Sequence, residues 1–395
     1  MAAKAELSLA GRDVTSLEDL TVAEIVGLVR LAGDMAEAIG FGDPTGTRTA
    51  VDPLDCILGL LFFEPSTRTR LSFEAAMLRL GGSCVGFAEP GASSVAKGET
   101  LADTARIVAG YTDALVVRHP LAGAARVVAD AAEVPVVNAG DGARAHPTQS
   151  LTDLFLLWRR KGRLDGLTVG LCGDLKHGRT VHCLAPVLAR LGSRTVCISP
   201  PALRMPEVAL RKVEEAGGER PPQVTHMGEV LGSLDALYVT RVQRERFPTH
   251  EEFERAAGSY RLTPELLAAA PAEMLVMHPL PRVDEIPPEV DGDPRAVYFE
   301  QAAGGVPVRM ALIAALLGLQ KLAAMPAAQG TDVPPRARRP ADALRCANPK
   351  CVLAHEPGLT GNVLELRGDP PLTVCGYCEE PFAQTVLEAQ GPVSP

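Results

Sequence analysis

Hydroxyl and guanidinium side chains gather at Ser66-Thr67-Arg68-Thr69-Arg70, two residues after the end of 56–63, an apolar run short enough to be a buried strand. Pro65 prevents an earlier helical start and Ser66 is a typical N-cap, so the segment predicts a strand, a tight turn and a helix. Helix N-termini favour anions, and the planar guanidinium of Arg68 suits a phosphate. A capped helix with surface arginines is the alternative, but clustered cations at a helix N-terminus repel one another unless an anion compensates.

Arginine, histidine and amide side chains follow several other apolar segments at their expected ends. They are Arg118, His146 with Gln149, Arg179, Arg241 with Gln243, and the segment 278–282. Side chains at the carboxyl ends of parallel strands face the ligand crevice, so five such strand ends favour a pocket for a small anion over unrelated turns. Pro279 and Pro281 stiffen the last turn and fix its backbone carbonyls as acceptors for an amide.

Two further segments have competing interpretations. Ser94 and Lys97 lie in a polar loop that is either a solvated surface loop or an anion contact. Residues 173–180 match the phosphate-loop pattern G-x-x-x-x-G-K-[ST], except that Arg179 replaces the lysine. No companion apolar strand ends in a magnesium-binding aspartate, so we expect Arg179 to bind a carboxylate rather than a nucleotide.

Apolar segments of strand and helix length alternate along most of the chain and must position these side chains. Candidate strands are 56–63, 83–88, 114–119, 135–140, 168–173, 194–199, 236–240 and 274–279. Candidate helices are 20–39, the helix with Leu71, Ala75 and Leu78 on one face, 100–111, 121–132, 147–158 and a last apolar helix, 308–322. This alternation predicts an α/β fold of two domains with parallel sheets flanked by helices.

The expected domain limits follow from this pattern and from a change in composition. We place the first domain at 1–150, with a returning helix within 302–322, and the second domain at 151–301. Residues 323–340 are rich in Pro and Ala and predict a linker. Residues 341–395 form a small cysteine-containing module.

Composition excludes several classes of protein. The chain has 395 residues and a net charge of −9, which argues against a general nucleic-acid binder. No apolar run reaches the roughly 18 residues that span a bilayer, and Met1–Glu6 lack the apolar core of a signal peptide. We therefore expect a cytoplasmic protein with no membrane partner.

Four of the nine cysteines form two close pairs, Cys346-x4-Cys351 and Cys375-x2-Cys378. This spacing predicts a zinc site with four thiolate ligands, against the alternative of free thiols in a tail. His355 competes as a ligand, but four thiolates already complete a tetrahedral shell. We expect one structural Zn²⁺ per chain, on which the folding of so small a module depends.

Five motifs together resemble the catalytic chain of the aspartate carbamoyltransferases, in the family's order and over roughly residues 7–320. They are Phe-Phe-Glu-Pro-Ser-Thr-Arg-Thr-Arg (62–70), His-Pro-Thr-Gln (146–149), Gly-Arg-Thr-Val-His (178–182), Thr-Arg-Val-Gln (240–243) and His-Pro-Leu-Pro-Arg (278–282). The related ornithine enzymes typically carry Ser-Met-Gly and His-Cys-Leu-Pro blocks, and neither occurs here.

The resemblance implies transfer of the carbamoyl group of carbamoyl phosphate to L-aspartate, giving N-carbamoyl-L-aspartate and phosphate in pyrimidine biosynthesis. It assigns Ser66, Thr67, Arg68 and Thr69 to the phosphate, and Thr69, Arg118 and His146 to the carbamoyl carbonyl. Gln149 and the carbonyls of Leu280 and Pro281 would bind the carbamoyl amide. Arg179, Arg241 and Gln243 would bind aspartate, and Lys97 would reach both substrates. No cofactor is implied for catalysis.

The resemblance also implies an assembly. In the family, the loop that carries Ser94 and Lys97 enters the neighbouring subunit's site, so a homotrimer or a dimer of trimers with shared active sites is expected. The cysteine spacing resembles the zinc domain of the separate regulatory chain of some members. Here the module is fused to the catalytic chain, and the nucleotide-binding domain that normally precedes it has no counterpart. We expect the module to brace neighbouring catalytic subunits.

Two other functions remain open from the sequence. One is carbamoyl transfer to a different amino acid. The other is a non-catalytic subunit that only binds carbamoyl phosphate, against which Lys97, Arg179 and Arg241 argue, because a pure binder needs no aspartate clamp.

Overall fold

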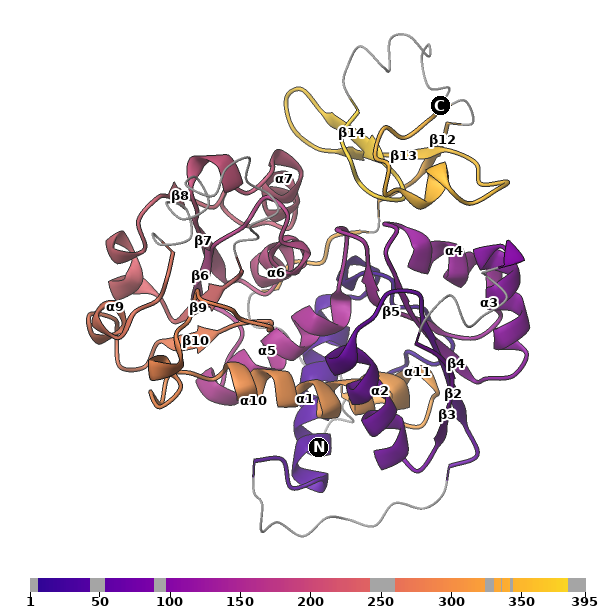
Figure 1. Cartoon of the computed structure of the whole chain (residues 1–395), viewed down its shortest axis with the longest axis horizontal. Helices are drawn as coiled ribbons and strands as arrows, with labels where there is room; N and C mark the ends of the chain where they lie inside the picture. Colours follow the sequence, from indigo (N-terminus) through magenta and orange to yellow (C-terminus); the bar gives the residue numbers. More distant parts are fainter. Residues whose placement is uncertain are drawn as a thin grey trace. The chain divides into compact units, whose positions relative to one another are not determined.

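The computed structural model of the chain describes residues 6–42, 54–88, 97–241, 260–323, 330–334, 336–341 and 344–382. The chain forms two compact units (Figure 1). Unit 1 comprises Met1–Leu151, Gly305–Ala327 and Val333–Pro395, and unit 2 comprises Thr152–Gly304 and Ala328–Asp332. Each unit contains a parallel sheet with helices, which confirms the predicted α/β fold. No helix among the described residues is long and apolar enough to cross a membrane.

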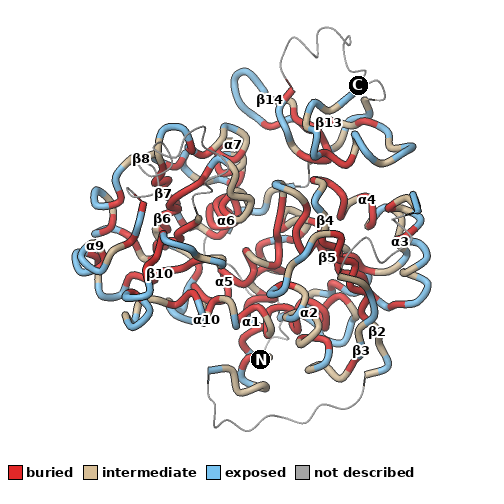
Figure 2. Tube along the Cα trace, viewed as in Figure 1, coloured by how far each residue is buried: buried red, intermediate tan, exposed pale blue. Residues whose placement is uncertain are grey.

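Unit 1 is built on four parallel strands in the order β3-β2-β4-β5. They are β2 (Ile57–Phe62), β3 (Ser83–Phe87), β4 (Ala114–His119) and β5 (Val136–Asp141). The inner strands β2 and β4 are almost wholly buried, as is β5, whereas the edge strand β3 is largely exposed (Figure 2). A parallel sheet covered on both faces requires continuous apolar runs, which is why these strands are evident in the sequence.

Helices surround this sheet and close the unit. They are α1 (Val22–Ala38), α2 (Thr67–Arg79), α3 (Leu101–Ala109), α4 (Ala124–Ala131), the start of α5 (Pro147–Lys161) and α11 (Gly305–Leu316). The returning helix α11 packs against both α1 and α2, and it is buried on every side. The chain ends of this part meet in a small antiparallel pair, β1 (Glu6–Leu7) with β11 (Leu322–Ala323).

Unit 2 repeats the architecture with five parallel strands in the order β10-β9-β6-β7-β8. They are β6 (Thr168–Cys172), β7 (Arg194–Ile198), β8 (Gln223–Val224), β9 (Ala236–Val239) and β10 (Leu275–Met277). Its helices are the rest of α5, α6 (Arg179–Arg190), α7 (Glu207–Glu215), α9 (Pro264–Ala268) and α10 (Tyr298–Ala303). The short strand β8 has no counterpart among the predicted strands.

The C-terminal cysteine module belongs to unit 1. Its antiparallel sheet has the order β12-β13-β14, with β12 (Arg339–Pro340), β13 (Asn362–Leu366) and β14 (Leu372–Cys375). Its apolar residues share one core with those of α3, α4 and β4. The module therefore packs on the helices and the sheet of unit 1 of its own chain.

Two details differ from the expected pattern. The helix predicted to run to Leu322 ends at Leu316, because Gly318 takes φ +71° and the N–H of Leu319 turns back to the carbonyl of Ala314 over 2.8 Å. The face of α2 that carries Leu71 and Leu78 is exposed, and the opposite face is buried.

Candidate active site

The first group of predicted site residues lies where the strand order of unit 1 reverses. From β2 the chain passes to β3 on one side, whereas β4 and β5 lie on the other side. In open parallel sheets, ligands bind outside the carboxyl ends of the strands at such a switch point. Residues 66–69 begin α2 directly after β2, and Arg118 stands near the end of β4, in register with Phe62. These residues therefore lie together at the edge of the sheet formed by the carboxyl ends of β2 and β4.

The start of α2 fits an anion site. Ser66 occupies the N-cap position, but its side chain makes no capping hydrogen bond to the helix. Thr69 is buried, whereas Thr67 and Arg68 are exposed. Partial burial lowers the pKa of Arg68, yet an arginine stays charged in proteins. One turn therefore carries helix N–H groups, the hydroxyl of Ser66, which does not cap the helix, and the cation of Arg68.

Arg118 is buried and held in place by two neighbours. Its Nη2 lies 3.0 Å from Oε2 of Glu64, and its Nη1 donates to the carbonyl of Ala139 over 3.1 Å. These contacts fix the plane of the guanidinium at the carboxyl edge of the sheet. Sequence analysis did not identify Glu64 as a site residue, although it stands within the 62–70 motif, next to Pro65.

A tightly bonded loop places His146. The Oδ1 of Asp141 accepts from the side chain of Asn138 over 2.9 Å and from the N–H of Ala145 over 3.2 Å. The carbonyl of His146 accepts the N–H of Gln149 over 3.0 Å, which starts α5. His146 is buried and Gln149 is half-buried. The loop and the helix start therefore fix the backbone of His146 from both sides along the chain.

The histidine beside Arg118 has a different character. Burial, and secondarily the neighbouring His355, lower the pKa of His119 to about 4. His119 is therefore neutral at pH 7, and its Nδ1 accepts the N–H of Leu121 over 3.0 Å. Lys97, by contrast, is exposed in the segment before α3. Ser94 lies outside the described residues.

The second group of site residues lies at the switch point of unit 2, between β6 and β9. Arg179 is the first residue of α6, which follows β6, and Arg241 follows β9. The two strand ends approach closely: a Cβ at Gly173 would lie 2.3 Å from the carbonyl oxygen of Thr240, so only glycine fits. Both guanidiniums are half-exposed at this edge. Gln243 lies outside the described residues.

A buried carboxylate organises the turn that carries Leu280 and Pro281. His278 lies between Glu285, whose Oε1 is 2.7 Å from its Nε2, and Leu280, whose N–H donates to its Nδ1 over 2.8 Å. Because Nδ1 is the acceptor, Nε2 is the nitrogen that donates to Glu285. Leu280 takes a φ of +51°, which is uncommon for a residue other than glycine. Glu285 was not predicted, and nothing in the motif pointed to it.

Replacing Glu285 with glutamine should lower the free energy of unfolding by about 1–3 kcal/mol at pH 7, because buried N–H groups lose a charged acceptor. Burial alone would raise the pKa of Glu285, but hydrogen bonds from His278 and backbone N–H groups lower it below its usual 4.5. The carboxylate therefore stabilises the fold fully above that value, and this contribution is lost as the pH falls through the lower folded-state pKa.

Urea unfolding of wild type and Glu285→Gln across this pH range measures the effect. The difference in the free energy of unfolding between the two proteins should be constant between about pH 8 and about pH 6. It should shrink at pH values below the pKa of a glutamate in the unfolded chain. A difference that is the same at every pH would contradict the role assigned to the charge.

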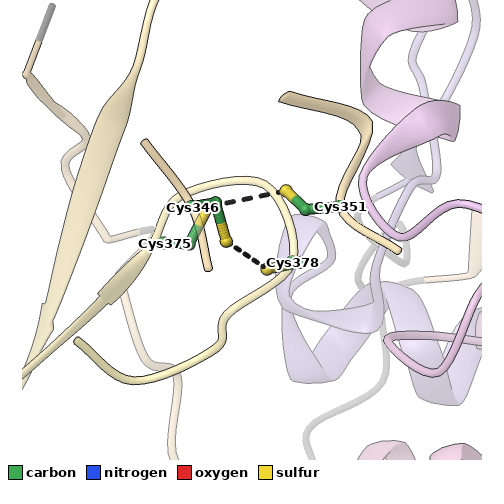
Figure 3. A group of neighbouring side chains, drawn as sticks. All are labelled: Cys346, Cys351, Cys375 and Cys378. Atoms are coloured by element: carbon green, nitrogen blue, oxygen red, sulfur yellow. Dashed lines mark hydrogen bonds between the residues drawn. The ribbon is translucent and has the colours of Figure 1, made fainter. Parts of the chain in front are cut away.

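The four module cysteines converge as a metal site would require (Figure 3). Their Sγ atoms all lie within 4.8 Å of one another, with Cys346 to Cys378 at 3.5 Å and Cys351 to Cys375 at 3.8 Å. A tetrahedral site with metal–sulfur bonds of about 2.3 Å has sulfur–sulfur edges of about 3.8 Å. All four are free thiols, so no disulfide competes. The Nε2 of His355 lies 2.6 Å from the carbonyl of Pro349, so that nitrogen is engaged elsewhere.

Two family models match consecutive parts of the chain. Residues 12–159 match the carbamoyl-phosphate-binding domain of aspartate/ornithine carbamoyltransferases, and residues 165–316 match the aspartate/ornithine-binding domain of the same enzymes. Neither match extends into the cysteine module.

Named relatives and solved structures agree with these matches. The chain is 50% identical to the aspartate carbamoyltransferase catalytic subunit of Thermococcus gammatolerans over 310 residues, covering 78% of this chain and 98% of the relative. The Methanopyrus kandleri catalytic subunit is also 50% identical, covering 79% and 99%. The Trypanosoma cruzi aspartate transcarbamoylase solved with N-(phosphonacetyl)-L-aspartic acid is 40% identical with a TM-score of 0.71, covering 78% and 97%. The catalytic subunit of M. jannaschii aspartate transcarbamoylase is 41% identical with a TM-score of 0.71, covering 78% of this chain and 99% of that one.

Proposed function

The chain belongs to the aspartate/ornithine carbamoyltransferase family and is an aspartate carbamoyltransferase, and we propose that units 1 and 2 divide the two substrates between them. It transfers the carbamoyl group of carbamoyl phosphate to the amine of L-aspartate, a step of pyrimidine biosynthesis. The observation that carries the division is that each sheet places motif residues at its own switch point. Residues 66–69 and Arg118 do so in unit 1, and Arg179 and Arg241 do so in unit 2.

Unit 1 binds carbamoyl phosphate in this proposal. Ser66, Thr67, Arg68 and Thr69 hold the phosphate at the N-terminus of α2, where N–H groups and a guanidinium neutralise its charge. Thr69, Arg118 and His146 donate to the carbamoyl oxygen. Gln149 of unit 1 accepts from the carbamoyl amide, and the backbone carbonyls of Leu280 and Pro281 are the exception to the division, because they accept from the same amide but belong to unit 2. A related T. cruzi enzyme has been solved with carbamoyl phosphate, which supports a site for this ligand in the family.

Unit 2 binds aspartate, whose two carboxylates call for two cations. Arg179 and Arg241 supply them, with Gln243 assisting and Lys97 reaching both substrates. Arg179 and Arg241 follow two adjacent strands, β6 and β9. Such a pair of guanidiniums suits a dicarboxylate better than an amino acid with a cationic side chain, which supports aspartate as the acceptor.

Positioning and charge neutralisation account for the chemistry. The amine nitrogen of aspartate attacks the carbamoyl carbon, a C–N bond forms, and the bond to the phosphate oxygen breaks. Arg118 and His146 stabilise the oxyanion that develops on the carbonyl oxygen. The departing phosphate accepts the proton that the amine loses, so no protein residue acts as nucleophile or essential base. A pH–rate profile that required a protein base would contradict this step.

Replacing Arg241 with alanine should raise KM for aspartate by about 10–100-fold, because a charge-assisted hydrogen bond worth about 1.5–3 kcal/mol is lost. KM for carbamoyl phosphate should change little. Steady-state assays with each substrate varied in turn measure both values. Arg261→Ala, at an exposed arginine of the same unit, is the matched control. Normal aspartate saturation in Arg241→Ala would show that the clamp is assigned wrongly.

Cys346, Cys351, Cys375 and Cys378 hold one structural Zn²⁺ in this proposal. The sulfur–sulfur distances fit tetrahedral zinc, and four protein ligands leave no open position for a substrate. The metal would neutralise the thiolates and join the segment before β13, which carries Cys346 and Cys351, to the turn at the end of β14, which carries Cys375 and Cys378. The module's likeness to the zinc domain of a regulatory chain rests on its cysteine spacing.

A homotrimer, or a dimer of trimers, completes the proposal. The exposed apolar residues of α2 and of the edge strand β3 support it: Leu71 is 55%, Leu78 61% and Val85 44% exposed in the single chain. Burial against a neighbouring subunit would remove this apolar surface from water. Lys97, exposed in the same unit, would then reach the neighbour's site.

A further inference from the structure

Backbone hydrogen bonds seat the cysteine module on the loop that follows β4. The N–H of Ala122 donates to the carbonyl of Lys350 over 2.8 Å, and the N–H of Val352 donates to the carbonyl of Ala122 over 3.0 Å. Gly123 lies so close to the module that a Cβ there would be 2.7 Å from the Cβ of Tyr377. The position of this loop is therefore tied to Cys351, one of the four cysteine ligands.

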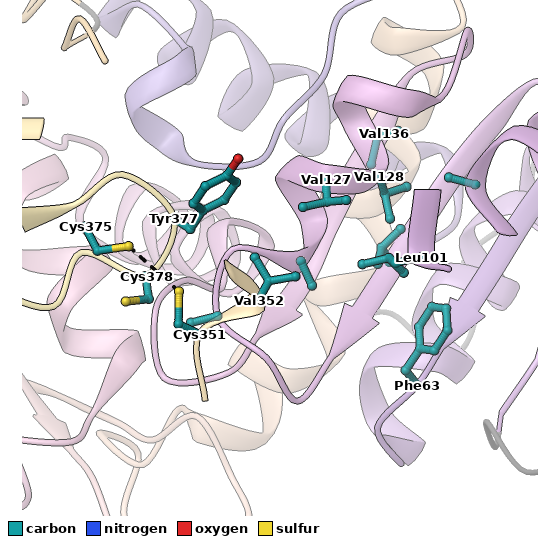
Figure 4. Close-up of a cluster of buried hydrophobic side chains, with 14 of the residues drawn as sticks. Phe63, Leu101, Val127, Val128, Val136, Cys351, Val352, Cys375, Tyr377 and Cys378 are labelled. Atoms are coloured by element: carbon teal, nitrogen blue, oxygen red, sulfur yellow. Dashed lines mark hydrogen bonds between the residues drawn. The ribbon is translucent and has the colours of Figure 1, made fainter. Parts of the chain in front are cut away.

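Apolar packing surrounds this seat. Figure 4 shows Val352 and Tyr377 of the module beside Val127 and Val128 of α4, in the cluster that also includes Leu101 of α3. Buried side chains of the two parts thus form one continuous core, which makes the seat rigid.

A buried ion-pair chain makes the second contact. The Nε of Arg144 lies 3.1 Å from Oε1 of Glu379, which directly follows the ligand Cys378. The Nη1 of Arg144 lies 3.3 Å from Oδ2 of Asp141, and the Arg144 side chain is only 4% exposed. Oδ2 of Asp141 also accepts the N–H of Gly123 over 2.9 Å. The ion-pair chain and the backbone seat therefore meet at one carboxylate.

Both contacts adjoin residues assigned to carbamoyl phosphate. Arg118 precedes the seated loop, and His146 follows the 141–145 loop that Asp141 closes through the N–H of Ala145. The N–H of Gly142 donates to the carbonyl of His119 over 2.9 Å and joins the two segments. A shift of either segment would move a group that must meet the carbamoyl oxygen.

We propose that Glu379, Arg144 and Asp141 are positioning residues that hold Arg118 and His146 in register with bound carbamoyl phosphate. The inference rests on the proposed function, since it concerns the same half-site. None of the three touches the substrate. The module acts through them as a brace, so the catalytic geometry of this chain depends on a carboxylate supplied from far along the sequence.

The test compares the full-length, metal-loaded wild type with Glu379→Gln, which removes the charge but keeps the shape. We expect kcat/KM for carbamoyl phosphate to fall by about 10–100-fold, because small misplacements of catalytic groups cost rate on that scale. Affinity for phosphonoacetamide, a stable analogue with a methylene in place of the labile oxygen, should fall in parallel. KM for aspartate and zinc content, both measured well below the thermal midpoint of either protein, should stay close to wild type, which a purely structural role would not predict.

Two variants sharpen the comparison. Glu380→Gln makes the same change at the adjacent, exposed glutamate and should match wild type. Arg144→Gln should show a loss at least as large as that of Glu379→Gln, and adding Glu379→Gln to it should change little, because the path is already broken. Additive losses, or a Glu379→Gln enzyme with wild-type kinetics and analogue affinity, would overturn the inference. A wild-type enzyme that forms no N-carbamoyl-L-aspartate from carbamoyl phosphate and L-aspartate would instead overturn the proposed function.

Discussion

Replacing Arg118 with alanine is expected to lower kcat by about 10²–10³-fold, the loss seen when one preorganised donor to a developing oxyanion is removed. The guanidinium is buried and fixed by Glu64 and the carbonyl of Ala139, so it reaches the transition state without reorganisation. Alanine also leaves Glu64 without this cation, so the remaining charge of the site would disfavour an anionic substrate.

Steady-state rates at saturating concentrations of both substrates measure this effect. Arg106→Ala is the matched control, because Arg106 is an exposed arginine of the same unit, and within the described part of the chain its ion pair is with the nearby Asp103. Circular dichroism and thermal unfolding exclude a misfolded variant. If a correctly folded Arg118→Ala enzyme retained more than about a tenth of the wild-type kcat, this would show that Arg118 does not stabilise the transition state.

Removing the metal is expected to unfold the cysteine module. Binding of zinc to such sites is worth about 10–16 kcal/mol, and the short strands β12, β13 and β14 offer little core of their own apart from the one shared with unit 1. We expect one zinc per chain in the purified protein, and a chelator or Cys375→Ser should expose the amides of residues 344–382 to hydrogen exchange. Cys56→Ser, at a half-buried thiol outside the cluster, should keep its zinc.

The same samples report on assembly. Light scattering should give a mass of three or six chains when metal is bound. A smaller mass after chelation would show that the module braces neighbouring subunits, whereas an unchanged mass would assign the trimer to the catalytic part alone. Unchanged exchange after complete loss of zinc would contradict a structural role for the metal.

Much of the catalytic fold was predictable because its signals are local. The continuous apolar runs of β2 and β4 exist because a parallel sheet is covered on both faces, and Pro65 with Ser66 marks the start of α2 within the chain itself. The predicted site residues stand at or just after strand ends, so locating the strands also located Arg118 and Arg241, while their roles stay predictions.

The features that sequence analysis missed depend on contacts between distant residues. Glu379 meets Arg144, and Glu285 meets His278, only after folding has brought the segments together. The strands of the cysteine module are short and are held together by the cysteine cluster. Their apolar periodicity, by which a strand is recognised in a sequence, is therefore weak. The exposed face of α2 could not be told from a buried one, because Leu71 and Leu78 have the apolar spacing of a core-facing helix.

The covalent link between module and catalytic part has a consequence for dilution. Leu322 pairs with the N-terminal strand, Arg336 binds Glu18, and β12 joins β13, so the connecting chain is anchored to unit 1 at several points. When two binding parts are tethered in one chain, the effective concentration of one part at the other is of the order of millimolar, whatever the amount of protein in solution. The brace on the carbamoyl-phosphate half-site should therefore survive at protein levels at which a separately encoded chain would dissociate.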